Sequence, residues 1–131
     1  MGRPAASRPS GLVPRHKVWL NWGGLFLMGP RYLQFFEAVE RTGTIREAGR
    51  TVGWSYRTCL NRIRRMETVL GRPVLITTRG GARHGGARLS PEVKRLLRVF
   101  AAWRQAMRRV SDQSFQKVLG QSGTKQSVAR L

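Results

Sequence analysis

The chain has 131 residues, which is enough for one domain of ordinary size and short for two. Its 25 Lys and Arg outweigh its 6 Asp and Glu, and the formal charge of +19 argues against a cationic partner and favours a polyanion such as nucleic acid. One cysteine and two histidines are too few for an ordinary four-ligand zinc site, so we expect no metal and no cofactor.

Residues 1–16 read MGRPAASRPSGLVPRH, and their three prolines and scarce apolar side chains predict a flexible basic arm. Ser10–Arg15 is either natural sequence or part of a protease-cleavage tag, and the arm is left out of the fold in both cases. The most apolar stretch, Val18–Met28, is shorter than the ~20 residues that span a bilayer, and no signal-peptide cleavage site follows it. We expect a cytoplasmic, nucleoid-associated protein without a membrane partner.

The segment Lys17–Met28 contains two short runs rich in Trp, Leu and Phe that flank a glycine pair, a pattern typical of a β-hairpin. A helix is expected to begin at Pro30 and to end at Gly43, because Pro is favoured in the first helical position and Gly just beyond the last. Thr44 and Glu47 form a capping-box pattern that predicts the start of a second, short helix.

The second helix is expected to end at Gly53, and Ser55 is expected to cap the third. The third helix, Tyr56–Leu70, is the most periodic segment of the chain. An apolar stripe recurs along it at helical spacing: Cys59, Ile63, Met66 and Leu70. Polar side chains repeat on the opposite face: Arg57, Asn61, Arg64 and Thr68. This pattern predicts a helix that seats one side on a core and exposes a basic side.

A strand is expected at Val74–Thr78, followed by a glycine-rich basic loop and a second strand at Ala87–Leu89. Another helix is expected from about Pro91 to Val110, after a serine cap, and residues 111–131 are expected to form a flexible polar tail. The fold predicted for residues 17–110 is mainly α with a small β-sheet (α+β). It is a winged helix-turn-helix with an amino-terminal β-hairpin and a long carboxy-terminal dimerisation helix.

The order of these elements and several motifs resemble the amino-terminal winged helix-turn-helix of LysR-type regulators. The matching positions align without a gap: Gly43–Ile45, Ala48, Val52, Ser55, Ile63–Glu67, Leu70-Gly71 and Pro73–Leu75. The DNA-binding domain of the molybdate-responsive ModE-type regulators resembles the chain more closely. It shares the preceding hairpin, the turn at Gly53–Tyr56 and the glycine-rich wing at Gly80–Ser90, so the resemblance covers roughly residues 17–108.

This resemblance implies a DNA-binding protein. The oxyanion-binding domains of ModE-type regulators lie carboxy-terminal to the DNA-binding domain, and nothing follows Leu131 here. We therefore expect no small-molecule ligand domain and no molybdate sensing. Two segments of the domain depart from the family pattern. Gly49 replaces the second alanine usual in the middle helix, at an expected cost of up to ~1 kcal/mol, and Thr58–Leu60 replaces an Ala-Ala-Trp-like run.

In a helix-turn-helix, the amino-terminal half of the recognition helix meets base edges and its later turns pass over the backbone. The candidate base-reading residues are therefore Ser55, Tyr56, Arg57, Thr58 and Asn61. Arg57 is suited to guanine and Asn61 to adenine. The candidate phosphate and wing contacts are arginines on the helices and around the loop: Arg46, Arg50, Arg62, Arg64, Arg65, Arg79, Arg83 and Arg88.

The last predicted helix carries an apolar seam at alternating steps of three and four residues, as in a coiled coil. Its members are the candidate dimer contacts: Val93, Leu96, Phe100, Trp103, Met107 and Val110. We expect a homodimer whose recognition helices face half-sites ~34 Å apart. The alternative is that the seam packs only on its own domain.

Several residues carry both a functional and a structural interpretation. Cys59 is either a redox switch or, as its place on the apolar stripe favours, a buried structural side chain. His84 either reads phosphate or is solvated in its loop, and we favour the second. Most of the four tryptophans are expected in the core or in a dimer interface rather than stacked on bases, least clearly Trp54.

The leading hypothesis is a dimeric, sequence-specific transcriptional regulator that binds double-stranded DNA. The alternatives are a sequence-neutral architectural DNA-binding protein and a module that docks a protein through the same surface. An enzyme is not expected. The sequence has no paired carboxylates in a motif, no nucleophile with a placed His and no phosphate loop ending in Lys-Ser/Thr.

Overall fold

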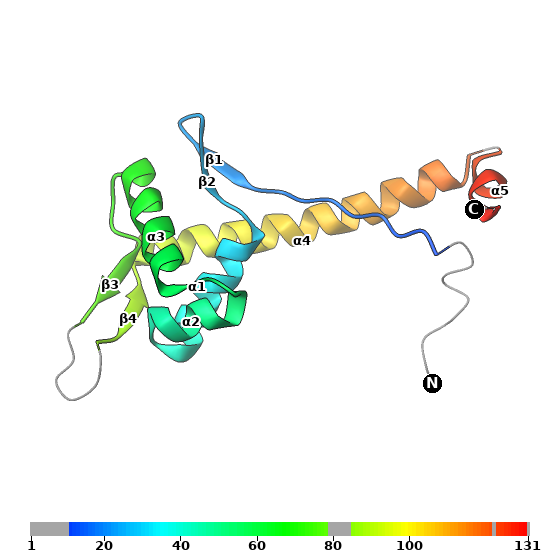
Figure 1. The fold of residues 1–131 in the computed structure, drawn as a ribbon. Helices are drawn as coiled ribbons and strands as arrows, with labels where there is room; N and C mark the ends of the chain where they lie inside the picture. Colours follow the sequence, from blue (N-terminus) through cyan, green and yellow to red (C-terminus); the bar gives the residue numbers. More distant parts are fainter. Residues whose placement is uncertain (1–10, 79–84, 122, 131) are drawn as a thin grey trace. The chain divides into compact units, whose positions relative to one another are not determined.

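The computed structural model describes most of the chain (Figure 1): residues 11–78, 85–121 and 123–130. The chain divides into two compact units, one formed by Lys17–Ala102 and the other by Met1–His16 together with Trp103–Leu131. The first unit contains the predicted hairpin, the predicted recognition helix and the strands of the predicted wing.

The first unit begins with the predicted hairpin. Strands β1 (Leu20–Trp22) and β2 (Leu25–Met28) pair antiparallel, with Trp22 opposite Leu25. The turn residues Gly23 and Gly24 have φ values of 56° and 82°, a conformation that residues with a Cβ rarely adopt. The hairpin prediction is confirmed, and the glycine pair is the physical reason for its turn.

Three helices follow: α1 (Pro30–Thr42), α2 (Ile45–Val52) and α3 (Tyr56–Leu70). Each ends at a glycine in the left-handed conformation, as predicted. The Thr44 hydroxyl accepts a hydrogen bond from the Glu47 N–H at 3.1 Å at the start of α2. The Ser55 hydroxyl accepts one from the Thr58 N–H at 3.1 Å at the start of α3. Both amino-terminal caps are therefore confirmed.

Strands β3 (Leu75–Thr77) and β4 (Ala87–Leu89) form a second antiparallel pair, with Leu75 opposite Leu89. The Ala87 N–H donates to the Gly43 carbonyl at 2.8 Å, which ties this pair to the end of α1. The loop residues 79–84 lie outside the described part of the chain. A helix-turn-helix followed by such a strand pair is a winged helix-turn-helix in a mainly α fold with small β-sheets, as predicted.

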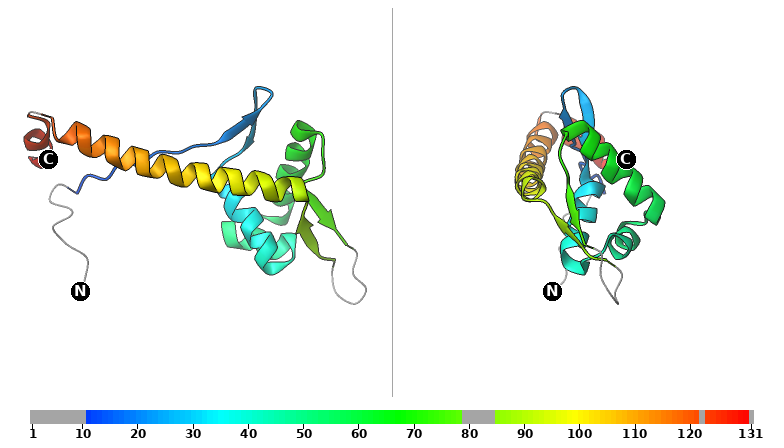
Figure 2. Two further views of the ribbon diagram at one scale, coloured as in Figure 1. Left: turned by 180° about the vertical axis from the view of Figure 1, so that it is seen from behind. Right: turned by 90° about the vertical axis from the view of Figure 1, so that its left-hand side faces the viewer.

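The core of this unit collects side chains from α1, α2, α3, the strands and the first turns of α4 (Pro91–Leu119). Its largest fully buried side chains include Phe35, Phe36 and Phe100. Helices α1, α2 and α3 gather around this core in each view (Figures 1 and 2). The packing encloses one side of α3 and leaves its other side exposed.

Gly49 is a requirement of this core. A Cβ at position 49 would lie 2.5 Å from the Cys59 sulfur and 2.8 Å from the Trp54 carbonyl oxygen. The Gly49 carbonyl also accepts a hydrogen bond from the Trp54 N–H at 2.9 Å. Alanine has the higher helix propensity, but packing against the cysteine sulfur decides the residue here.

Helix α4 ends at Leu119, so the end predicted at Val110 is wrong. The flexible tail predicted for residues 111–131 is also corrected, because a further helix, α5 (Thr124–Ala129), forms within that stretch. No glycine or proline lies between Pro91 and Gly120. Extending an existing helix also avoids the cost of nucleating a new one. The polar composition of this stretch is therefore compatible with helix.

Residues 11–16 form no helix or strand, and the earlier residues of the predicted arm lie outside the described part of the chain. None of the helices within the described residues combines the length and the apolar character that crossing a membrane requires.

Candidate nucleic-acid interface

The two faces of α3 have opposite environments. Cys59, Ile63 and Met66 are buried in the core, as the apolar stripe predicts. The side chains predicted on the opposite face are exposed, and Arg65 is exposed with them: Arg57, Asn61, Arg64 and Thr68. Helix α3 is therefore held by its inner side and presents guanidinium groups and an amide to solvent.

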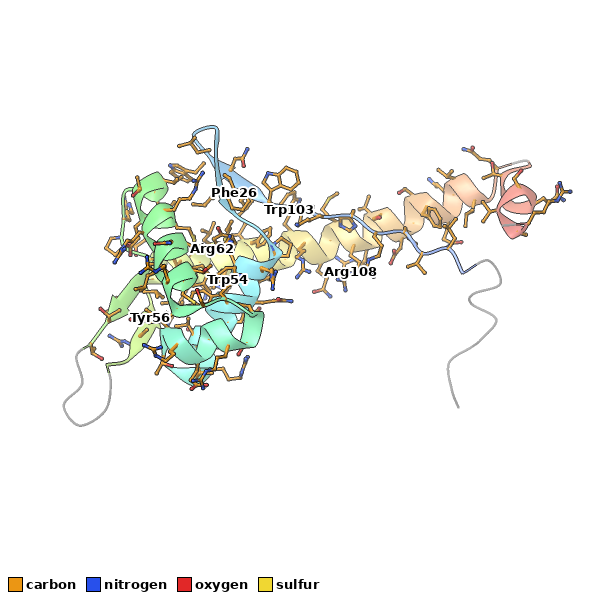
Figure 3. The ribbon with its side chains drawn as sticks, viewed as in Figure 1. Phe26, Trp54, Tyr56, Arg62, Trp103 and Arg108 are labelled. Atoms are coloured by element: carbon orange, nitrogen blue, oxygen red, sulfur yellow. The ribbon has the colours of Figure 1, made fainter. Side chains whose placement is uncertain are left out.

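The first turn of α3 is organised by its cap and by a cation–π contact. Besides accepting the Thr58 N–H, the Ser55 hydroxyl donates to the Thr58 hydroxyl at 3.0 Å. The guanidinium carbon of Arg46 lies 4.3 Å from the centre of the Tyr56 ring. The Tyr56 side chain, labelled in Figure 3, remains 40 % exposed. Of the five candidate base-reading residues, two thus stabilise the start of the helix and the other three are exposed.

Arg62 connects α3 to the turn before it and to α1. Its guanidinium carbon lies 4.7 Å from the centre of the Trp54 ring and 5.7 Å from that of Tyr32 (Figure 3). Its Nη1 donates to the Tyr32 hydroxyl at 3.2 Å. Stacking and hydrogen bonding together fix the orientation of a planar guanidinium. The structure also settles the least clear tryptophan, because Trp54 is only 9 % exposed and belongs to the core.

The two candidate arginines on α2 have different surroundings. Arg46 packs over Tyr56, whereas Arg50 Nη1 lies 2.9 Å from the Glu47 carboxylate in an ion pair whose side chains are 69 % and 52 % exposed. An exposed pair of this kind contributes little to stability, so Arg50 can exchange its partner for a phosphate at small cost.

Arg31 has a role that the sequence did not indicate. Its Nη2 donates to the carbonyl of Val52, the last residue of α2. This bond satisfies one of the carbonyls that a helix end leaves without a partner, and it fixes α2 relative to α1. The two residues are 21 positions apart, and no local pattern links them.

The wing contributes one described candidate contact. Arg88 is exposed on β4, between the buried side chains of Ala87 and Leu89. Arg79, Arg83 and His84 lie outside the described residues. The predicted approach of Arg88 to a DNA backbone is therefore sterically open, and the loop contacts remain predictions.

The apolar seam predicted for the last helix is divided between two environments. Val93 and Phe100 are 1 % and 0 % exposed in the core of the first unit, so their assignment as dimer contacts is wrong. A side chain enclosed by its own domain has no surface left for a partner, and Leu96 is packed partly against the same core. The other three candidates belong to the second unit, and their role in a homodimer stays a prediction: Trp103, Met107 and Val110.

The hairpin exposes aromatic residues that were expected to be covered. Trp19 and Trp22 are 53 % and 55 % exposed, so their placement in the core is wrong, and a place in a dimer interface stays a prediction. Leu27 and Met28 are the hairpin residues that enter the core. Burial in β2 follows position along the strand: Leu25 and Phe26, next to the turn, are exposed, and Leu27 and Met28, where the chain approaches α1, are buried.

Cys59 has the structural role favoured by the sequence. Its side chain is fully buried, and burial raises the pKa of its thiol above the ordinary value. Because the thiolate is the reactive form, a buried thiol of raised pKa is poorly suited to redox switching. Across the described residues, no three His, Cys, Asp or Glu side chains gather as a metal site requires.

These observations define a winged helix-turn-helix domain with an exposed basic recognition helix. Residues 30–92 match the family described as "Bacterial regulatory helix-turn-helix protein, lysR family". The motifs by which the sequence resembles LysR-type regulators lie within this matched segment.

Two relatives share parts of the sequence. The chain is 35 % identical over 75 residues to the molybdenum-pterin-binding protein MopB of Rhodobacter capsulatus, a match that covers 57 % of this chain and 28 % of MopB. It is 32 % identical over 79 residues to the molybdenum transport protein ModE of Herbaspirillum seropedicae, a match that covers 60 % of this chain and 28 % of ModE. The chain therefore spans less than a third of the length of either relative.

The fold is also found in a solved structure. The crystal structure of the CbnR_DBD–DNA complex superposes on this protein with a TM-score of 0.52 at 22 % sequence identity, covering 67 % of this chain and 95 % of the other. The similarity confirms the predicted fold class.

Proposed function

We propose that this protein is a transcriptional regulator that binds double-stranded DNA with α3 in the major groove. The observation that carries the proposal is the exposed face of α3, which presents Arg57, Asn61 and Arg64 while the opposite face is fixed in the core. The major groove admits one α-helix, and Arg and Asn pair with guanine and adenine there. The formal charge of +19 adds attraction to the phosphates.

The comparisons support this proposal. Residues 30–92 match a regulatory helix-turn-helix family, and the structurally similar CbnR_DBD is bound to DNA. MopB and ModE carry molybdenum functions in their names, but this chain matches only 28 % of each. The proposal therefore includes DNA binding and no role for molybdenum.

We assign roles to the candidate residues from their surroundings. The proposed base-reading residues are the exposed ones near the start of α3: Tyr56, Arg57 and Asn61. Ser55 and Thr58 set the position of the first turn. The proposed phosphate contacts with described side chains lie on α2, α3 and β4: Arg50, Arg64, Arg65 and Arg88. Arg46 is instead proposed to orient the Tyr56 ring.

We also propose that the protein acts as a homodimer through apolar side chains of the second unit. Val110 is 54 % exposed there, and the seam to which it belongs continues through Met107. A large apolar side chain in such a seam is better covered by a second helix than by water. A two-fold dimer would bind two half-sites about one turn of DNA apart.

The test begins with selection of bound duplexes from a random library, followed by affinity measurements on the selected site. Arg57→Ala and Asn61→Ala are each expected to weaken that site by about 5- to 150-fold and to relax preference at one base position. Arg98→Ala removes an exposed arginine from α4 and serves as the matched control, with the preference retained.

Two results would contradict the proposal. Equal affinity for all duplexes, with a steep dependence on salt, would indicate the sequence-neutral architectural function. Absence of duplex binding, with a protein partner whose binding survives Arg57→Ala plus Arg64→Ala, would indicate the docking module.

A further inference from the structure

A pocket lies beside α3, where this helix meets the hairpin and α1. Its volume is about 440 Å³, and six residues from β2, α1 and α3 line it: Phe26, Tyr32, Thr58, Asn61, Arg62 and Arg65. This volume is within the range of ~300–1,000 Å³ that is typical of small-ligand sites. Since four of the lining residues belong to α3, the pocket adjoins the proposed DNA-binding face.

One wall of the pocket is aromatic. The rings of Phe26 and Tyr32 meet edge to face, with their centres 5.5 Å apart. Tyr32 is buried, whereas Phe26 is still 36 % exposed although it is a large apolar side chain. An aromatic ring held in this way offers a surface on which a sugar or a base can pack.

The lining residues contributed by α3 are cationic and polar. Arg65 and Asn61 are exposed on α3, and no carboxylate among the described residues pairs with Arg62 or Arg65. The guanidinium of Arg62 is held over Trp54 and by the Tyr32 hydroxyl, so it has a fixed position at the pocket. Two unpaired cations beside an amide favour an anion with several acceptor oxygens, and a phosphate fits that description.

We propose that this pocket binds a nucleotide through its phosphate, with the attached sugar or base packed against Phe26. Arg65 donates to the phosphate oxygens, and Arg62 is a positioning residue that also adds positive charge. Through Phe26, the hairpin would then contact the nucleotide beside α3. This inference deepens the proposed function if the nucleotide belongs to the bound duplex. A free mononucleotide has the same chemistry and would compete with DNA.

The first arm of the test uses the full chain and the selected duplex. Phe26→Ala is expected to weaken binding about 3- to 10-fold without changing the salt slope, because it removes an apolar contact. Arg65→Gln is expected to lower the salt slope by about 0.9, as loss of one phosphate contact requires. The loss of affinity in the double variant should differ at least about threefold from the product of the two single losses, because both residues contact one nucleotide.

Matched controls come from neighbouring positions that do not line the pocket. Leu25→Ala removes an apolar side chain that is 55 % exposed on the same strand, and it should leave affinity nearly unchanged. Arg64→Gln also removes a proposed phosphate contact, but its effect should be independent of Phe26→Ala. Thermal unfolding of each variant, with Phe26→Leu as a milder substitution, separates loss of the contact from loss of the fold.

The second arm uses thymidine 5′-monophosphate and inorganic phosphate as free probes, with the Asn61 side-chain amide followed by NMR. The mononucleotide is expected to shift this resonance at lower concentration than phosphate does, and Arg65→Gln should abolish the shift. This arm tests the pocket even if the chain does not bind DNA. Absence of DNA binding would contradict the proposed function and would leave the assignment of the pocket to be decided by the free probes.

The two arms together identify the source of the nucleotide. Coupling of Phe26 and Arg65 on the duplex assigns the pocket to bound DNA, and a mononucleotide shift without that coupling assigns it to a free nucleotide. If Phe26→Ala behaves like Leu25→Ala on the duplex and neither probe shifts the Asn61 amide, the proposal is wrong.

Discussion

Helices α3 and α4 show the same kind of apolar periodicity in the sequence and differ in what covers it. In α3 the stripe through Ile63 is enclosed by the core, and the opposite face is basic and exposed. In α4 the seam enters the same core at Val93 and Phe100, whereas Val110, further along, is 54 % exposed. Periodicity therefore indicates an amphipathic helix without indicating whether its apolar side meets its own domain or a second chain.

The largest expected effect concerns the enclosed part of α4. Phe100→Ala should lower the free energy of unfolding by about 3–5 kcal/mol, because it removes a fully buried ring and leaves a cavity. Urea unfolding measures this loss. Val99→Ala is the control, because the Val99 side chain, next to Phe100 in the sequence, is 63 % exposed. This substitution should change the free energy of unfolding by less than about 0.5 kcal/mol. A Phe100→Ala protein of unchanged stability that no longer dimerises would restore the dimer assignment.

The enclosed side of α3 gives the next effect. Gly49→Ala should lower the free energy of unfolding by about 1–3 kcal/mol, although alanine is the better helix former, because its Cβ would collide with the Cys59 sulfur. Adding Cys59→Ala should recover part of this loss by removing the sulfur, with the Trp54 carbonyl contact left in place. Urea unfolding of the two single variants and the double variant measures the coupling. Stabilisation by Gly49→Ala alone would show that the helices can separate at this point.

The exposed side of α3 gives a smaller effect. Arg46→Ala should weaken binding of the selected duplex by about 2- to 5-fold, the size of an exposed cation–π contact. If Arg46 acts by orienting the Tyr56 ring, most of this loss should vanish in a Tyr56→Leu background. An equal loss in both backgrounds, with a lower salt slope, would instead mark Arg46 as a direct phosphate contact.

The exposed part of α4 gives an effect on association alone. Val110→Ala should weaken the proposed homodimer by roughly 0.8 kcal/mol per subunit, because it removes two methyl groups and only the 54 % of Val110 that is exposed is left for a partner to bury. It should leave the unfolding of the first unit unchanged. Sedimentation equilibrium of the wild-type chain and the variant measures the dimer dissociation constant. A wild-type chain that is monomeric at all concentrations would remove the homodimer from the proposal.

Boundaries of the early elements were predictable because they depend on local backbone preferences. Gly23 and Gly24 adopt the positive φ values that their turn needs, and Pro30, Thr44 and Ser55 stand where three helices begin. The predicted end of α4 at Val110 was too early, because it was inferred from the polar composition of the residues that follow. A growing helix ends at a helix-breaking residue rather than at a polar one.

Much of the candidate site was not predictable in the same way. The contacts of Arg62 with Tyr32 join residues 30 positions apart, and they give this arginine a fixed orientation that its place on a basic face did not indicate. The pocket beside Phe26 has a similar origin, since it requires β2, α1 and α3 to meet. Contacts between distant segments leave no periodic signal in one sequence.

Charge, capping residues and helical spacing were sufficient for the class of domain and for the basic face of its recognition helix, because each is a property of a short stretch of chain. The folded chain alone decided which apolar surfaces are covered: it encloses Phe100, leaves Trp19 and Trp22 exposed, and makes a glycine necessary at position 49. Burial depends on which remote segments come together, and that is settled by packing the whole core.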